Sequence, residues 1–268
     1  MNTYSFASQT RRIGLNSRFL KPAVAKACST IGCVQKHWQA RLGEAAKPAK
    51  PSTHQPPVQS SLSSAKQRAL LRQQALTEAQ QGNHTEAIVL FSHLIDCNPT
   101  SANDYSNRGL VYFQNGQADA ALADYNRAIE LNPRLDSAYN NRANYYAAQG
   151  QFLEAILDYD VALDLNPVNS RAWINQAITF RELEMYDRAI ESLELALCLG
   201  KLEGHIYAER GRTHHLQGDW NCAVADYRRA LALLPESSTF QKNPSVRLRA
   251  QVERWLASLV GSQPDTAD

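Results

Sequence analysis

Residues 122–146 read LADYNRAIELNPRLDSAYNNRANYY, and parts of this stretch return elsewhere in the chain at a constant interval. The Asp-Tyr pair at 124–125 recurs at 158–159 and again at 226–227. The Tyr and Asn-Arg at 139–142 repeat the same residues at 105–108. Self-similarity at a fixed period is the sequence signature of a repeat architecture.

The prolines set the length of the repeat. Pro99, Pro133 and Pro167 are 34 residues apart, and Pro235 follows after twice that interval. A glycine stands at the midpoint of each unit except the fourth, where Glu184 takes its place. The five units that result are 68–101, 102–135, 136–169, 170–203 and 204–237.

Each half of a unit carries apolar residues at helical spacing, which predicts a pair of helices. A midpoint glycine permits a tight turn between the two helices, and a final proline ends the second one. One such pair cannot bury its apolar face alone, so neighbouring pairs must stack to form a continuous core. The sequence therefore predicts an all-α protein of helix-turn-helix repeats.

The period and these residues resemble the tetratricopeptide repeat (TPR) family over about 68–237. The family's early aromatic residue is matched at Tyr105, Tyr139, Trp173 and Tyr207. The resemblance implies a right-handed TPR superhelix, which is a type of α-solenoid. The first unit departs most from the pattern, and the fourth lacks both the midpoint glycine and the final proline. The wording of the repeats is similar to that of TPR proteins from cyanobacteria and plastids, several of which help to assemble photosynthetic complexes.

Regions outside the repeats complete the predicted organisation. A capping helix is expected within 238–260, because Asn243-Pro244 resembles a helix start and solenoids need their last core face covered. Its apolar stripe consists of Leu248, Val252, Trp255, Leu256 and Leu259. The predicted divisions are a basic, weakly amphipathic segment (1–43), a disordered Pro/Ser/Ala linker (44–65), five repeats (66–237), the capping helix (238–260) and a disordered tail (261–268).

The N-terminal 64 residues are strongly basic. They contain nine Lys or Arg residues and one acid, Glu44, which leaves the rest of the chain with a net charge of −6. A basic amphipathic helix suits an anionic membrane surface or a partner's groove. The alternative is an organellar transit peptide. The expected location is intracellular, either soluble or membrane-peripheral: cytoplasmic in a bacterium, and plastid or mitochondrial in a eukaryote.

Three units carry an arginine and an aspartate at fixed places, eight residues before and after the midpoint. Antiparallel helices would bring the two side chains level, so we expect ion pairs between the helices of one unit. In the fourth unit both residues change together, to Gln176 and Ser192. The alternative is that the charges are independently solvated. The expected pairs are Arg108–Asp124, Arg142–Asp158 and Arg210–Asp226.

In TPR proteins the first helix of each repeat lines a groove. Asn107, Asn141 and Asn175 share one position there and resemble the asparagine ladder with which some TPR superhelices hold a peptide backbone. An amide both donates and accepts hydrogen bonds, which suits that task. Alternatively, these asparagines are simply solvated. The family's two-carboxylate clamp for chaperone tails is incomplete here. The other groove residues expected to contact a peptide are Asn140, Asn144, Arg171, Arg181 and Arg212.

We expect no enzyme, cofactor or metal site. No phosphate loop, H-E-x-x-H or G-x-S-x-G motif occurs, and adjacent His214 and His215 face different directions on a helix. Five irregularly spaced cysteines favour reduced thiols over a disulfide framework, and Cys198 and Cys222 are expected to be core residues.

The acidic body makes nucleic acid an unexpected partner, and neither a membrane-spanning segment nor a secretory signal is expected. The leading hypothesis is a non-enzymatic scaffold, adaptor or assembly factor that binds client peptides in the groove. The rival hypotheses are a docking or regulatory subunit of an enzyme complex, and a protein anchored to a membrane by its basic N-terminus.

Overall fold

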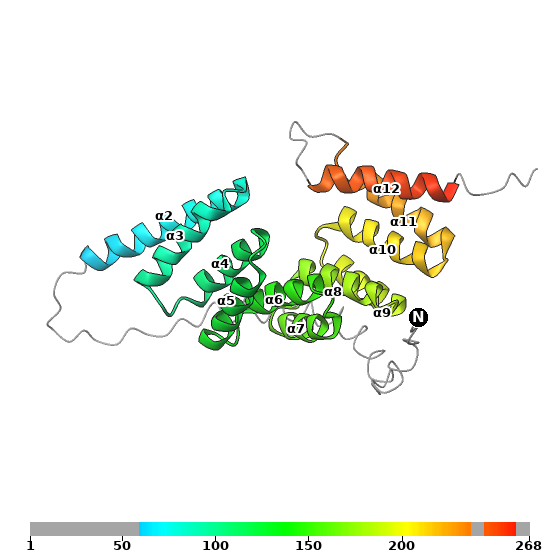
Figure 1. The fold of residues 1–268 in the computed structure, drawn as a ribbon. Helices are drawn as coiled ribbons and strands as arrows, with labels where there is room; N and C mark the ends of the chain where they lie inside the picture. Colours follow the sequence, from blue (N-terminus) through cyan, green and yellow to red (C-terminus); the bar gives the residue numbers. More distant parts are fainter. Residues whose placement is uncertain (1–58, 237–243, 261–268) are drawn as a thin grey trace, which may run out of the picture. The chain divides into compact units, whose positions relative to one another are not determined.

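The computed structural model describes residues 59–236 and 244–260, with side chains described from residue 65 onward. Within these ranges the chain forms eleven α-helices and no strand (Figure 1). The predictions for the segment 1–43, for most of the linker and for the tail 261–268 lie outside the described residues.

The helices follow the predicted units closely, two to a unit, with one helix after the last unit. In chain order they are α2 (Gln59–Gln81), α3 (His84–Cys97), α4 (Ala102–Gln114), α5 (Ala118–Leu131), α6 (Asp136–Ala148), α7 (Phe152–Leu165), α8 (Ser170–Glu182), α9 (Tyr186–Leu197), α10 (Glu203–Gln217), α11 (Trp220–Leu233) and α12 (Pro244–Val260).

Consecutive helices pack as hairpins, and each hairpin packs on the next. The five hairpins are α2–α3, α4–α5, α6–α7, α8–α9 and α10–α11. The second helix of each hairpin also contacts the first helix of the following one. The all-α architecture of helix-turn-helix repeats is thus confirmed. The core runs from hairpin to hairpin, as it must when a single pair cannot bury its own apolar face.

Small residues lie where the two helices of a hairpin approach closely. Gly109 of α4 lies against the fully buried ring of Tyr125 on α5, and a Cβ at position 109 would come within 2.8 Å of that ring. Gly211 and Tyr227 repeat this contact at the same distance in the fifth hairpin. The recurring small residue therefore sets how near the aromatic side chain of the second helix can come.

The turns within hairpins require a left-handed backbone. Gly150, between α6 and α7, has φ of 74°, a conformation that costs glycine little. In the fourth hairpin the same turn falls on Glu184, whose φ is 58°. Helix α8 still ends at the position expected from the other repeats, because Met185 N–H donates to the carbonyl of Phe180 at 2.9 Å. The missing glycine is therefore tolerated at the expense of a strained residue.

The first hairpin is longer than its repeat. Helix α2 begins at Gln59, so the boundary predicted at residue 66 falls inside the helix. No proline or glycine stands between Pro57 and Gly82, and nothing in that stretch stops the helix from extending backward. The linker predicted over 44–65 is too long at its C-terminal end. Its serine content favoured disorder, but the stretch after Pro57 contains no residue that breaks a helix.

Helix α12 covers the last hairpin. It begins at Pro244, in agreement with the expected helix start, and packs on α10 and α11. Val252 is fully buried, and the ring of Trp255 stacks on Tyr227 with centroids 5.8 Å apart. All five residues of the predicted apolar stripe belong to this cluster.

We predict that Glu184→Gly stabilises the protein. Glycine removes the strain of a left-handed residue, which is about 1–2 kcal/mol. Against this, glycine gives the unfolded chain more conformational entropy, which lowers stability by about 0.4–1 kcal/mol. The expected net gain is about 0.5–1 kcal/mol, measured by urea unfolding. Glu184→Gln controls for the loss of the exposed charge. The strain argument fails if Gly and Gln variants are equally stable.

Candidate functional site

The first helices of successive hairpins contact one another, which creates a shared surface. Contacts join α4 to α6, α6 to α8, and α8 to α10. Two hydrogen bonds made by asparagines cross the first two of these contacts: Asn141 Nδ2 donates to Ser106 Oγ at 3.2 Å, and Asn175 Nδ2 donates to Asn144 Oδ1 at 2.9 Å. Together with Asn107, also half-buried, these asparagines define what we call the inner face.

The inner face keeps unused hydrogen-bonding groups. Among the described residues, none donates to Oδ1 of Asn141 or of Asn175, and each amide uses only one of its two N–H groups. Asn144 differs, because its Oδ1 accepts from both Tyr159 Oη (2.6 Å) and Asn175. Neighbouring side chains thus fix the orientation of the asparagines at 141 and 175 while an acceptor and a donor remain available on each.

Asn140 occupies a different environment from the other asparagines. The equivalent residues in the neighbouring units, Ser106 and Ile174, are buried, and Asn140 Oδ1 is itself buried without a hydrogen-bond partner among the described residues. A buried oxygen at this position is not accessible to a bound peptide. Asn140 is therefore a poorer candidate for peptide contact than sequence spacing alone indicates.

Two of the three expected groove arginines already have partners. Arg181 Nη1 donates to Glu209 Oε2 at 2.6 Å, which links α8 to α10. Arg212 lies over the ring of Trp255, 5.1 Å from its centroid, and so packs against α12. Arg171 is exposed at the start of α8. The basic character of this end of the inner face therefore rests on Arg171 more than on the other two.

The predicted arginine–aspartate pairs are all within hydrogen-bond distance. Arg142 donates through Nε and Nη2 to both carboxylate oxygens of Asp158, at 2.7 and 2.9 Å. The Arg108–Asp124 and Arg210–Asp226 pairs have the same two-bond geometry. The nearby carboxylate raises the pKa of each arginine. Buried carboxylates thus have full partners, as burial requires.

The fourth hairpin replaces the ion pair with a neutral one. Ser192 Oγ donates to Gln176 Oε1 at 3.1 Å. Gln176 also donates through Nε2 to Asp160 Oδ1 at 2.7 Å, across to the preceding hairpin. The two substitutions therefore preserve the contact while removing both charges.

The same first-helix residue reaches backward in every one of these hairpins. Arg108 donates to Ser92 at 3.0 Å and Arg142 to Asn126 at 2.7 Å, while Arg210 lies 3.8 Å from Glu194. Each side chain thus joins its own second helix to the second helix of the preceding hairpin. We call Arg108, Arg142, Gln176 and Arg210 the staple residues. The sequence signal for this second contact was the polar residue 16 positions upstream of each, at 92, 126, 160 and 194.

The first hairpin has an additional attachment besides the contact between Arg108 and Ser92. Arg72 donates through Nη2 to Asp104 Oδ2 at 2.7 Å, which links α2 to α4. Burial acts to raise the pKa of Asp104, but hydrogen bonds from Arg72 and Ser101 outweigh it, and the net effect is a lowered pKa. Sequence reasoning missed this pair because it lies outside the repeated positions.

Cysteine placement corrects one expectation. Cys198 and Cys222 are both exposed, so the prediction that they are core residues was wrong. Cys222 precedes Ala223, which is the buried residue of that turn, and Cys198 follows the buried Ala196 at the end of α9. Among the described residues, one group brings three metal-ligand types together: His214, Asp219 and Cys222.

Family models for the TPR match the chain at three places, residues 90–123, 109–150 and 140–202. Residues 90–202 belong to the tetratricopeptide repeat family. No curated protein matches the chain. The TPR assignment accounts for the hairpins described above, and proteins of this family generally serve as interaction scaffolds.

Solved structures share the TPR superhelical fold. A thermophilic TPR protein of Thermus thermophilus, TTC0263, is 19% identical with a TM-score of 0.59, covering 72% of this chain and 98% of its own. PilF of Pseudomonas aeruginosa is 20% identical with a TM-score of 0.58, covering 74% and 94%. MamA is 19% identical with a TM-score of 0.52, covering 59% and 92%. At these identities the likeness concerns the fold alone.

No helix within residues 59–236 and 244–260 has the length and apolar character needed to cross a membrane.

We predict that Arg142→Ala costs about 3–5 kcal/mol of unfolding free energy, since it leaves the 9%-exposed Asp158 carboxylate without its partner. The double change Arg142→Gln with Asp158→Ser copies the fourth hairpin and should cost less. Urea unfolding measures both.

Arg127→Ala serves as the matched control, because its pair with Glu130 is exposed and contributes only about 0–1 kcal/mol. If Arg142→Ala costs no more than the double variant, then the ion pair is not what satisfies Asp158.

Proposed function

We propose that the protein is a non-enzymatic scaffold whose inner face holds an extended segment of a partner protein. The observation that carries this proposal is the placement of Asn107, Asn141 and Asn175 at one position of three consecutive first helices, with amide groups still available. Neighbouring side chains orient the amides at 141 and 175. Preorganised groups of this kind lose less entropy on binding than free side chains do.

The chemistry fits recognition of a peptide backbone. An extended strand offers an N–H and a C=O at every residue. An asparagine amide can form hydrogen bonds with both groups at once and does not need to contact the side chains of the bound segment. Binding along the inner face would therefore tolerate different client sequences.

Selectivity would arise at the α8 end of the inner face. Arg171 is exposed there, and the Arg181–Glu209 pair lies along the same first helices. Clients with an acidic stretch near this end would bind more tightly, with an advantage that weakens as salt rises. The finer role that we infer is an adaptor or assembly factor that brings such clients to a larger complex. Attachment to an anionic membrane through the basic segment 1–43 would localise this adaptor at the membrane surface.

One observation favours the rival role of a docking subunit that works through its outer surface. Helix α7 exposes three apolar side chains at every fourth position: Leu153, Leu157 and Val161. Such a stripe on a second helix lies apart from the inner face and would suit a partner's apolar surface.

Photo-crosslinking distinguishes the two roles. A photoreactive residue is placed in the full-length chain at Asn107 on the inner face, or at Leu157, whose exposed fraction is 66%. The scaffold proposal expects client crosslinks from position 107 that fall within one short extended segment. Crosslinks from position 157 alone would assign the binding to the outer surface and overturn the proposal.

We predict that replacing Asn107, Asn141 and Asn175 together with alanine weakens binding of crosslinked clients. Each net hydrogen bond is worth about 0.5–1.5 kcal/mol, so the triple variant should lose about 2–4 kcal/mol if contributions add. Clients of different sequence should lose similar amounts, because the amides contact only the backbone. Titration calorimetry measures the change.

Ser106→Ala is the control for structural damage. It removes the acceptor that orients Asn141 but leaves all three asparagines in place, so it should weaken client binding by much less than the triple variant does. Equal affinity of the triple variant and the wild-type chain would show that the asparagines are merely solvated.

A further inference from the structure

The turn of the fifth hairpin differs chemically from the equivalent turns of the three hairpins before it. Units two to four place Tyr112, Tyr146 and Phe180 at the last aromatic position of the first helix, where the fifth unit has His214. They place Gln117, Gln151 and Met185 where it has Asp219, and Ala120, Glu154 and Arg188 where it has Cys222. All three departures introduce a side chain of a type that commonly binds zinc.

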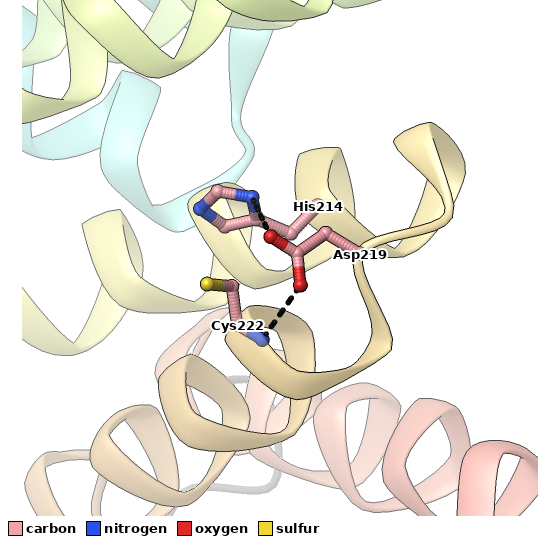
Figure 2. A group of neighbouring side chains, drawn as sticks. All are labelled: His214, Asp219 and Cys222. Atoms are coloured by element: carbon pink, nitrogen blue, oxygen red, sulfur yellow. Dashed lines mark hydrogen bonds and ion pairs between the residues drawn. The ribbon is translucent and has the colours of Figure 1, made fainter.

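The structure brings these three departures together. The ligand atoms of His214, Asp219 and Cys222 all lie within 4.8 Å of one another, and Figure 2 shows the three side chains gathered beside one turn. His214 lies in the last turn of α10, Asp219 is the residue before α11, and Cys222 lies in the first turn of α11. The group therefore spans the junction between two helices.

The backbone of this turn is fixed. Gly218 adopts φ of 88°, which glycine permits, and Asp219 N–H donates to the carbonyl of His214 at 2.9 Å. Asp219 Oδ1 accepts from the backbone N–H of Cys222 at 3.1 Å, which caps α11. This bond turns the other carboxylate oxygen, Oδ2, toward the imidazole.

Among the described residues, none forms a hydrogen bond with the Nδ1 atom of His214. Its side chain is 14% exposed, and Nδ1 is buried without a hydrogen-bond partner. Asp219 Oδ2, the nearest acid, is 4.0 Å away, too far for a hydrogen bond. A buried nitrogen without a partner is destabilising unless something else satisfies it.

We propose that His214 Nδ1, Asp219 Oδ2 and Cys222 Sγ form a site for a zinc-class divalent metal ion. Zn–N and Zn–O distances of about 2.1 Å place tetrahedral N and O ligands about 3.4 Å apart, so the imidazole and carboxylate need to approach by only about 0.6 Å. Asp219 and Cys222 are exposed and can rotate inward. Three protein ligands leave the fourth position to a water molecule.

Binding requires the thiol to lose its proton to solvent, so that the thiolate sulfur donates an electron pair to the ion. The neighbouring Asp219 carboxylate raises the pKa of Cys222. A bound ion would coordinate the Asp219 carboxylate, and its positive charge would counteract the effect of that carboxylate on the pKa of Cys222. It would also tie the end of α10 to the start of α11, and thereby brace the hairpin that carries α12.

The test uses the full-length reduced chain and Co²⁺ as a spectroscopic substitute for Zn²⁺. We expect one equivalent of Co²⁺ to produce a thiolate-to-cobalt charge-transfer band that Zn²⁺ abolishes. Cys222→Ser should remove the band and weaken Zn²⁺ binding at least about 100-fold, since losing even an outer-shell partner costs about 10–100-fold. Asp219→Asn keeps a good helix cap but loses the anionic ligand, and should also weaken binding.

His214→Tyr restores the residue of the second and third units, so it removes a ligand in a form that the fold already accepts. His215→Ala and Cys198→Ser are matched controls that should retain the band. Zn²⁺ should also raise the thermal midpoint of the wild-type chain but not of Cys222→Ser. The proposal is overturned if Cys222→Ser and His214→Tyr bind as the wild type does, or if Cys97→Ser, which breaks the 3.8 Å contact with His93, removes the band instead.

Discussion

A buried polar group needs a partner, and in this protein that requirement holds successive hairpins in register. Each staple residue satisfies an acid or hydroxyl on its own second helix and a polar side chain on the preceding one. Apolar packing alone would leave neighbouring hairpins free to slide. The directional bonds oppose this movement, because a shift by one residue would separate Arg142 from Asn126 of the preceding hairpin. Tyr139 and Tyr146 flank the guanidinium of Arg142 at 5.8 Å and limit its movement further.

Much of the fold could be predicted because the chain contains its own comparisons. The repeated spacing predicted the hairpins, and three of the units predicted the arginine–aspartate pairs. The capping helix was predicted from the helix start at Asn243-Pro244 and the apolar stripe that follows it. Some contacts escaped prediction because they are not repeated. Arg72 and Asp104 occur once, so no second copy drew attention to them. The exposure of Cys222 depended on which of two adjacent residues the first turn of α11 buries, and a hydrophobic pattern does not resolve a rotation of one residue.

The candidate site was harder to predict than the fold for a related reason. Position along a repeat identifies which residues share a face, but not which of their atoms are already engaged. Asn107, Asn141 and Asn175 fall on one surface as the spacing implies, yet Asn140 turns its oxygen into the interior beside them. Arg212 looked like a groove cation in sequence and packs on Trp255, a residue of the capping helix. Such contacts depend on segments that lie outside the repeat and cannot be inferred from its period.

Helix α12 has a consequence for the assembly of whole molecules. A repeat protein carries at its end the same stacking surface that joins its internal units, and an open surface of that kind can add another chain end to end. Here Val252 and Leu259 are buried against the fifth hairpin, and Trp255 lies on Tyr227. The surface that would receive a sixth unit is thereby filled from within the same chain. A second chain therefore cannot stack on the fifth hairpin in the way that one repeat stacks on the next.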